Sequence, residues 1–182
     1  MPEIKHQKKK RSMLTPQGWW DSPIAGKVHF QSKYEKLFCE FLDTRGLNWR
    51  KNKERFPYTS PFDGKQHSYI PDFIVYTSSG KKIYIEVKGM VRKADPAKFE
   101  AFPKGEILVL LGYKELKNLG LDVKDPTEYY RNPDGTEKKL DPNKWPYKLL
   151  QNMPDFQERG ELTEELKKKV DPKPFYSLLC QS

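Results

Sequence analysis

Three charged side chains, Asp72, Glu86 and Lys88, flank or interrupt the two apolar runs of residues 69 to 90, whose sequence is YIPDFIVYTSSGKKIYIEVKGM. Asp72 follows a proline at the start of the run FIVY, and Glu86 and Lys88 lie two positions apart in IYIEVK. Side chains alternate along a β-strand, so Glu86 and Lys88 point to the same side, with Cα atoms roughly 7 Å apart. If the two runs form a hairpin closed by TSSGKK, Asp72 lies near the end that faces Glu86 and Lys88.

Two carboxylates that converge at the end of a strand make an oxygen-rich site. Mg²⁺ prefers such a site, because it binds one or two carboxylates and keeps its waters and a substrate phosphate. A nearby ammonium group can hold or deprotonate an attacking water, or neutralise charge that develops on the phosphate. A single Pro-Asp pair is an ordinary turn start, and a single Glu-x-Lys is an ordinary solvated strand face. Their combination favours hydrolysis of a phosphodiester by Asp72, Glu86 and Lys88.

The clearest helix is predicted over SKYEKLFCEFLDTRG, residues 32 to 46. Ser32 and Glu35 have the spacing of a capping box, and Gly46 ends the segment. One buried stripe is predicted from residues that recur at helical spacing, namely Tyr34, Leu37, Phe38, Phe41 and Leu42.

The other predicted elements have weaker sequence patterns than this helix, but their order along the chain fits a single fold. LNWRKNKERFPY is predicted as an edge strand, HSYIPDFIVYTSSGKKIYIEVKG as a β-hairpin, ADPAKFEAFPKG as a short helix or turn, EILVLL as a buried strand, and GYKELKNLG as a closing helix. TPQGWWDSPIAGKVHF is predicted to be turn-rich and pinned to the body by Trp19 and Trp20. These elements predict an α/β fold, with a mixed central sheet and helices on both faces.

The chain is predicted to have three parts. Residues 1–12 form a basic arm, residues 13–120 form the domain, and residues 121–182 form an irregular, proline-rich C-terminal extension. Within the extension, ELTEELKKKV can form one short helix. Docking of the extension is expected through Trp145, Tyr147, Leu149 and Leu150.

Composition limits the classes of function. The formal net charge is +9, and 32% of residues are charged. A basic body favours a polyanionic partner, of which nucleic acid is the commonest, although a solvated surface would look similar. Phosphate contacts are expected from the arm and from the segment after the second strand, through Lys8, Lys9, Lys10, Arg11, Arg92 and Lys93. The alternatives for these residues are a solubilising tail and a solvated loop.

Several other classes are excluded or disfavoured. Cys39 and Cys180 lack metal-ligand spacing and indicate a reducing compartment without a disulfide framework. The longest aliphatic run, ILVLL, is too short to span a bilayer, and the N-terminus lacks the apolar region of a signal peptide. We therefore expect no membrane partner and a cytoplasmic location. No phosphate-binding loop or dinucleotide fingerprint is present, so no nucleotide cofactor is expected.

Two short motifs resemble the PD-(D/E)xK nuclease superfamily. Pro71-Asp72 and Glu86-Val87-Lys88 match its signature, and FQSKYE, residues 30–35, resembles the F-x-S-x-x-E helix opening of several branches. The resemblance implies a restriction-endonuclease-like fold and a Mg²⁺-dependent DNA endonuclease, with Mn²⁺ as a substitute. It also implies that Asp72, Glu86 and the Val87 carbonyl bind the metal, that Glu35 completes the metal shell, and that Lys88 positions the attacking water. The alternative role of Glu35 is that of a simple capping residue.

Within the superfamily, the chain is similar to two phage families. It resembles the phage endonuclease I family, which resolves Holliday junctions, over about residues 30–95. Its segment SKYEKLFCEFLD, with Trp49, PY and IEVK, resembles phage head-completion nucleases. The first family implies a junction-selective endonuclease that acts as a homodimer in the host cytoplasm.

The second family implies a nuclease that trims DNA ends during packaging and docks on a capsid or portal, so that a virion location stays open. Transposon-end or homing-type endonucleases and a non-catalytic DNA-binding module are further alternatives. Residues 121–182 match none of these families.

Overall fold

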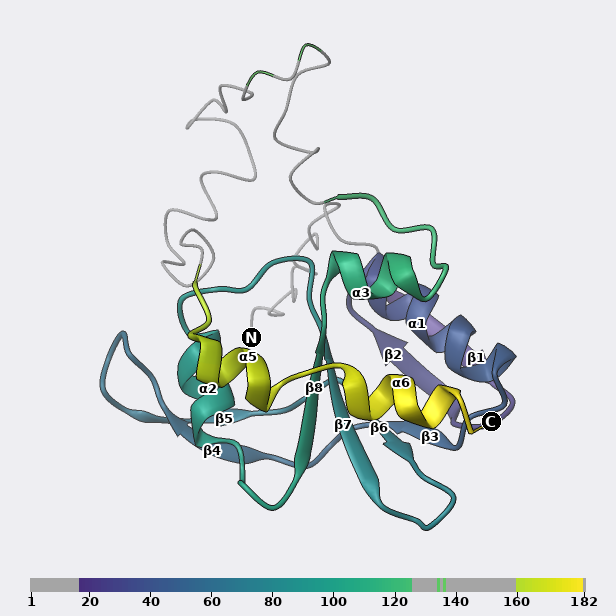
Figure 1. Cartoon of the computed structure of the whole chain (residues 1–182), viewed down its shortest axis with the longest axis horizontal. Coiled ribbons are helices and arrows are strands. Elements are labelled where there is room, and N and C mark those ends of the chain that lie inside the picture. The colour runs from purple at the N-terminus through teal and green to yellow at the C-terminus, as the bar shows by residue number, and fades with distance from the viewer. Residues whose placement is uncertain (1–16, 126–133, 135, 137–159, 182) are drawn as a thin grey trace, which may run out of the picture.

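A four-stranded mixed sheet forms the centre of the protein (Figure 1). The computed structural model describes residues 17–125, 134, 136 and 160–181. The strand order is β3-β6-β7-β8, with β7 antiparallel to β6 and parallel to β8. The strands are β3 (Trp49–Lys51), β6 (Phe73–Tyr76), β7 (Lys82–Val87) and β8 (Ile107–Leu111). The α/β class and the mixed sheet are confirmed, as are the β6–β7 hairpin and the edge position of β3.

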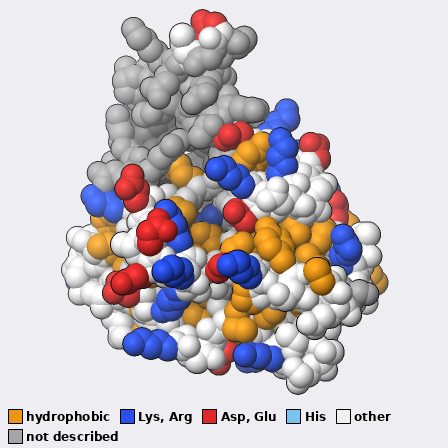
Figure 2. Space-filling model, in the orientation of Figure 1, with side chains coloured by type: hydrophobic (Ala, Val, Ile, Leu, Met, Phe, Trp, Pro, Cys, Tyr) orange, Lys and Arg blue, Asp and Glu red, His pale blue; other side chains and the backbone are white. Residues whose placement is uncertain are grey.

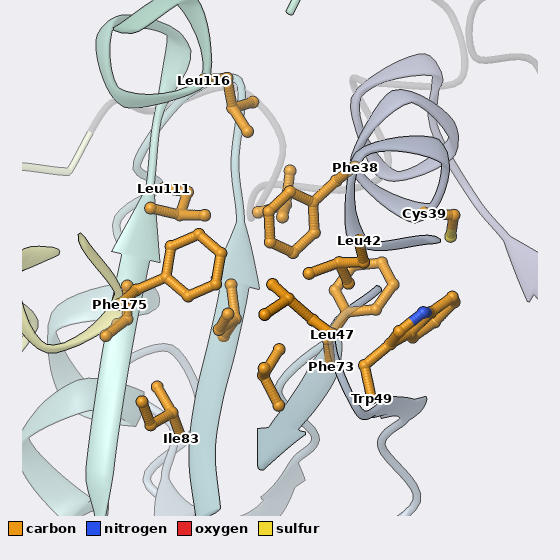
Figure 3. Close-up of a cluster of buried hydrophobic side chains, with 14 of the residues drawn as sticks. Phe38, Cys39, Leu42, Leu47, Trp49, Phe73, Ile83, Leu111, Leu116 and Phe175 are labelled. Atoms are coloured by element: carbon orange, nitrogen blue, oxygen red, sulfur yellow. The ribbon is translucent and has the colours of Figure 1, made fainter. Parts of the chain in front are cut away.

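Helices cover both faces of this sheet, because both faces of its strands are apolar. The first face packs against α1 (Lys33–Thr44), α3 (Tyr113–Asn118) and α6 (Lys173–Leu179). Figure 3 shows Phe38 and Leu42 of α1, Leu116 of α3 and Phe175 of α6 gathered over the face of the sheet that carries Phe73. The second face presents Ile74, Tyr84 and Leu108 to α2 (Asp95–Ala101) and α5 (Glu164–Lys169). The predicted two-sided arrangement of helices is therefore confirmed.

Helix α1 begins and ends where the sequence predicts. Ser32 is its N-cap, and its hydroxyl accepts a hydrogen bond from the Glu35 backbone N–H. Phe38 and Leu42 are fully buried, and the other three residues of the predicted stripe pack beside them. Gly46 follows the helix at φ +63°, a left-handed conformation that glycine adopts without steric cost.

Two small β-hairpins lie outside the central sheet and differ from the predictions. β1 (Gly18–Ser22) pairs with β2 (Gly26–Phe30), so the turn-rich prediction for this segment is wrong. β4 (Phe56–Thr59) pairs with β5 (Gln66–Tyr69), so HSY does not join FIVY in one strand. The break between β5 and β6 falls at Ile70 and Pro71, where proline has no N–H to donate to a ladder.

The two tryptophans of β1 have different environments. The Trp20 Nε1–H donates a 2.8 Å hydrogen bond to Asp43 Oδ2 on α1. Trp19 is 61% exposed and packs edge-on against His29, at 5.2 Å between ring centroids. Trp20 therefore fixes the hairpin to the body as predicted, whereas Trp19 does not.

We predict that Trp20→Phe lowers the free energy of unfolding by about 1–2 kcal/mol, because a charged acceptor loses its indole donor. The matched control is Trp19→Phe, which should change it by less than about 0.5 kcal/mol, as is usual at exposed positions. Urea unfolding of the three proteins measures both values. Equal effects at the two positions would contradict the assigned roles.

The C-terminal part requires a correction to the predicted domain boundary at residue 120. The short helix predicted in ELTEELKKKV is confirmed as α5, but α6 was not predicted. Phe175 is fully buried against Phe38, at 5.7 Å between ring centroids, and Val123 joins the same cluster. Residues 160–181 thus complete the core on both faces instead of forming an irregular extension.

Some predictions fall on residues outside the described ranges. They concern the basic arm, with Lys8, Lys9, Lys10 and Arg11, and the docking residues Trp145, Tyr147, Leu149 and Leu150. Among the helices that are described, none is both long and apolar enough to cross a membrane.

Candidate functional site

Asp72 and Glu86 meet at one end of the β6–β7 hairpin. The strands pair Phe73 with Ile85, so continuing this antiparallel register by one residue places Asp72 opposite Glu86. Residues directly opposite in an antiparallel pair point to the same face. The Asp72 carboxylate is fixed there, because its Oδ2 accepts a 2.9 Å hydrogen bond from the Val87 backbone N–H. Glu86 also raises the pKa of Asp72 by Coulombic repulsion, which indicates that the two carboxylates lie near each other.

Glu86 and Lys88 form an ion pair that two further residues support. Lys88 Nζ lies 2.9 Å from Glu86 Oε1, and the Tyr69 hydroxyl donates to Glu86 Oε2 at 3.1 Å. Lys88 Nζ also lies 3.3 Å from Asp95 Oδ1. Asp95 is completely buried at the first residue of α2, where its Oδ2 accepts a hydrogen bond from the Arg92 backbone N–H. Lys88 is thus held between two carboxylates.

Glu35 reaches the same region from α1 through a second lysine. Its Oε2 lies 2.5 Å from Lys51 Nζ and accepts a 3.1 Å hydrogen bond from the Gln31 backbone N–H. Lys51 Nζ also lies 3.7 Å from Asp72 Oδ1. Lys51 therefore connects Glu35 to the Asp72 carboxylate.

The electrostatics of the site show an excess of negative charge around Asp72. Burial, together with the nearby charges of Glu86 and Glu35, raises the pKa of Asp72 well above its usual range, against the opposing effect of Lys51. Burial alone would lower the pKa of Lys88, but Glu86 and Asp95 outweigh it, so this pKa is raised. Lys88 is therefore a cation at neutral pH. Held between Glu86 and Asp95, its ammonium group can orient a water or stabilise negative charge.

The carboxylates fit a divalent cation by their chemistry. Asp72 and Glu86 offer hard oxygen ligands, and a cation beside Asp72 would relieve the repulsion that raises its pKa. Within residues 17–125, 134, 136 and 160–181, no group of three or more His, Cys, Asp or Glu side chains is arranged to hold a metal ion. In the structure the ammonium group of Lys51 contacts Glu35 and Asp72, and that of Lys88 contacts Glu86. The Val87 backbone supports Asp72, and the role of its carbonyl as a metal ligand stays a prediction.

The structure brings some of the predicted site residues together, but not all of them. Asp72, Glu86 and Lys88 lie together, and Glu35 joins them through Lys51. The Arg92 backbone N–H supports Asp95, and Lys93 is exposed, and the predicted phosphate contacts of both side chains stay predictions.

Sequence reasoning missed Lys51, Tyr69 and Asp95. The only local signal for Asp95 was its place at the start of a predicted helix, and Lys51 stood in a predicted edge strand without any motif. Lys51 and Tyr69 reach the site through contacts between segments distant in the sequence, whereas Asp95 lies only seven residues after Lys88.

Comparison with known proteins found no family model, no curated protein and no solved structure that matches this chain.

Proposed function

We propose that this protein is a Mg²⁺-dependent DNA endonuclease of the PD-(D/E)xK type, with a restriction-endonuclease-like fold. The observation that carries the proposal is the meeting of Asp72 and Glu86 at one end of the hairpin, with Lys88 held beside Glu86. This arrangement is what the short sequence motifs require if they are to act together. Mn²⁺ shares the preference for oxygen ligands and should substitute for Mg²⁺.

Each residue has a distinct role in the proposed reaction. A bound Mg²⁺ would polarise a phosphoryl oxygen and lower the pKa of a water molecule. Asp72 and Glu86 would supply its carboxylate ligands and Glu35 would complete its shell, while the Val87 N–H keeps Asp72 in the required orientation. Lys88 stays charged, orients the attacking water and offsets the negative charge that grows on the phosphate. Asp95 and Tyr69 are positioning residues for Lys88 and Glu86.

The charge of the chain supports DNA as the substrate, without identifying its structure. The formal net charge is +9, which attracts a polyanion. On the face shown in Figure 2, Lys and Arg side chains are spread among acidic ones instead of forming one unbroken patch. We propose a junction or other branched DNA as the first candidate substrate, cleaved by a homodimer, and a DNA end during packaging as the second.

A cleavage assay on several DNA structures tests this proposal. The full chain is incubated with Mg²⁺ and with supercoiled, linear, four-way-junction or single-stranded DNA, and EDTA serves as the control. We expect cleavage that requires the divalent ion. Preference for the junction supports resolution of branched DNA, and preference for linear ends supports the packaging role. Absence of ion-dependent cleavage on every substrate would refute the proposed function.

A further inference from the structure

Lys51 makes close contacts with two of the carboxylates at the site. Its Nζ lies 2.5 Å from Glu35 Oε2 and 3.7 Å from Asp72 Oδ1, and 4.2 Å from the centroid of the Phe73 ring. Its side chain is 21% exposed, and that of Glu35 is 8% exposed. Because this ion pair is largely screened from solvent, the loss of either partner leaves a poorly solvated charge.

The backbone around Lys51 is fixed, so only its side chain is free to change position. Lys51 pairs with Phe73 across β3 and β6, and the next residue, Asn52, donates a 3.0 Å backbone hydrogen bond to Asp72. Movement of the lysine stem therefore leaves the strand and the Asp72 backbone in place. The partial exposure of the side chain gives the ammonium group access to the surface beside the site.

We propose that Lys51 is the built-in counter-ion of the site. Its ammonium group holds Glu35 and Asp72 together in the metal-free protein, leaves them when a divalent cation binds there, and then contacts a DNA phosphate. This inference rests on the proposed function, because it assigns the exchange of partners to the same carboxylates.

The exchange of partners by Lys51 is expected because the ammonium group and a divalent cation would bind the same carboxylate oxygens. The oxygens that Lys51 contacts on Glu35 and Asp72 are the ones that a cation bound by both residues would need. A cation bound there therefore competes with the ammonium group, and part of its binding free energy is used to displace that group. A DNA phosphate offers the displaced ammonium a new anionic partner. Metal and DNA should consequently bind with positive coupling, and part of that coupling should depend on Lys51.

A permanent structural ion pair is the competing explanation. In that case Lys51 stays on Glu35 and Asp72 throughout, and the cation uses only the other oxygens of Asp72 and Glu86. The two explanations differ in the expected effect of removing the ammonium group. If the cation has to displace Lys51, the ammonium group weakens metal binding, so a substitution that removes this group strengthens metal binding. A permanent partner organises the carboxylates, so its removal leaves metal binding unchanged or weaker.

The test is a calorimetric titration of Mg²⁺ into the full chain without DNA, so that no cleavage contributes. We expect Lys51→Met to bind Mg²⁺ roughly tenfold more tightly than the wild type, within the range typical of coupled sites. The matched control is Lys36→Met, since the side chain of Lys36 on α1 is 45% exposed and, in the described part of the chain, forms an ordinary helical ion pair with Glu40. This control should bind Mg²⁺ as the wild type does.

A second measurement follows the coupling to DNA, with Ca²⁺ as a probe that also prefers oxygen ligands. Ca²⁺ should raise the DNA affinity of the wild type several-fold more than that of Lys51→Met. If Lys51→Met does not fold, as judged by circular dichroism, Lys51→Gln replaces it, because its amide still donates to Glu35 without the charge.

The outcomes separate the two proposals. Unchanged or weaker Mg²⁺ binding by a folded Lys51 variant overturns the counter-ion role and leaves the nuclease proposal intact. A wild-type protein that binds no Mg²⁺ and cleaves no DNA overturns both.

Discussion

Asp72→Asn is expected to reduce Mg²⁺-dependent DNA cleavage about a thousandfold, which corresponds to roughly 4 kcal/mol of lost transition-state stabilisation. The amide is nearly the same size as the carboxylate and can still accept the hydrogen bond from the Val87 N–H. It has no negative charge with which to bind a divalent cation. DNA binding without Mg²⁺ should remain, because the rest of the basic surface is unchanged.

A suitable control is Asp63→Asn, in the turn between β4 and β5. Asp63 is an exposed aspartate that pairs with His67, at 3.0 Å between Oδ2 and Nε2, and does not contact the site. Initial rates on the preferred DNA substrate, together with a gel-shift assay in EDTA, measure the two properties separately. Wild-type cleavage by Asp72→Asn would remove Asp72 from the reaction.

The same substitution should change how the stability of the metal-free protein depends on pH. The pKa of Asp72 in the folded protein is raised well above its usual range, mainly by burial and next by Glu86. A raised folded-state pKa favours the folded protein at low pH, and that contribution is lost as the pH rises from the unfolded value, near 4, through the folded one. Each unit of such a shift corresponds to about 1.4 kcal/mol.

The expected result in EDTA is therefore a difference between two unfolding curves. As the pH rises above about 4, the wild type should lose stability relative to Asp72→Asn, which cannot ionise at this position. Mg²⁺ should restore the wild type and not the variant, because a ligand stabilises only the form that binds it. Parallel pH profiles of the two proteins would contradict the raised pKa.

The parts of the fold that the sequence predicts well are those whose residues pack against near neighbours. Helix α1 repeats its apolar positions every three or four residues and begins at a serine cap, so its face and its start are visible locally. The β6–β7 hairpin is closed by a short polar turn, and its register, continued by one residue beyond Phe73 and Ile85, places Asp72 opposite Glu86. Two carboxylates in one hairpin can therefore be predicted to meet.

The parts that the sequence does not predict depend on hydrogen bonds and packing contacts that leave no periodic pattern in the sequence. The β1–β2 turn resembles an irregular loop in composition, but the Ser22 hydroxyl accepts hydrogen bonds from two backbone N–H groups and closes it. Phe175 follows a long segment of little periodicity and yet packs on Phe38 in α1. Lys51 and Asp95 enter the site only because β3 pairs with β6 and because α2 begins next to Lys88.

Lys88→Met is expected to reduce cleavage by about a thousandfold as well, through loss of one positive charge next to the reacting phosphate. Its side chain is 17% exposed, and its ammonium group is fixed between Glu86 and Asp95. The fold should persist in the variant. Glu86 retains the Tyr69 hydroxyl, and Asp95 retains Lys98 at 3.0 Å and the Arg92 N–H.

Lys98→Met is the matched control for this lysine, since both amines contact Asp95 Oδ1 and both side chains are about one-fifth exposed. No contact joins Lys98 to Glu86 among the described ion pairs, so its loss should leave most of the cleavage activity. The pH dependence of the wild-type rate adds a second criterion. Because Glu86 and Asp95 raise the pKa of Lys88, this lysine should keep its proton between about pH 6 and 9. A rate that rises through this range and loses that rise in Lys88→Met would instead make Lys88 the general base.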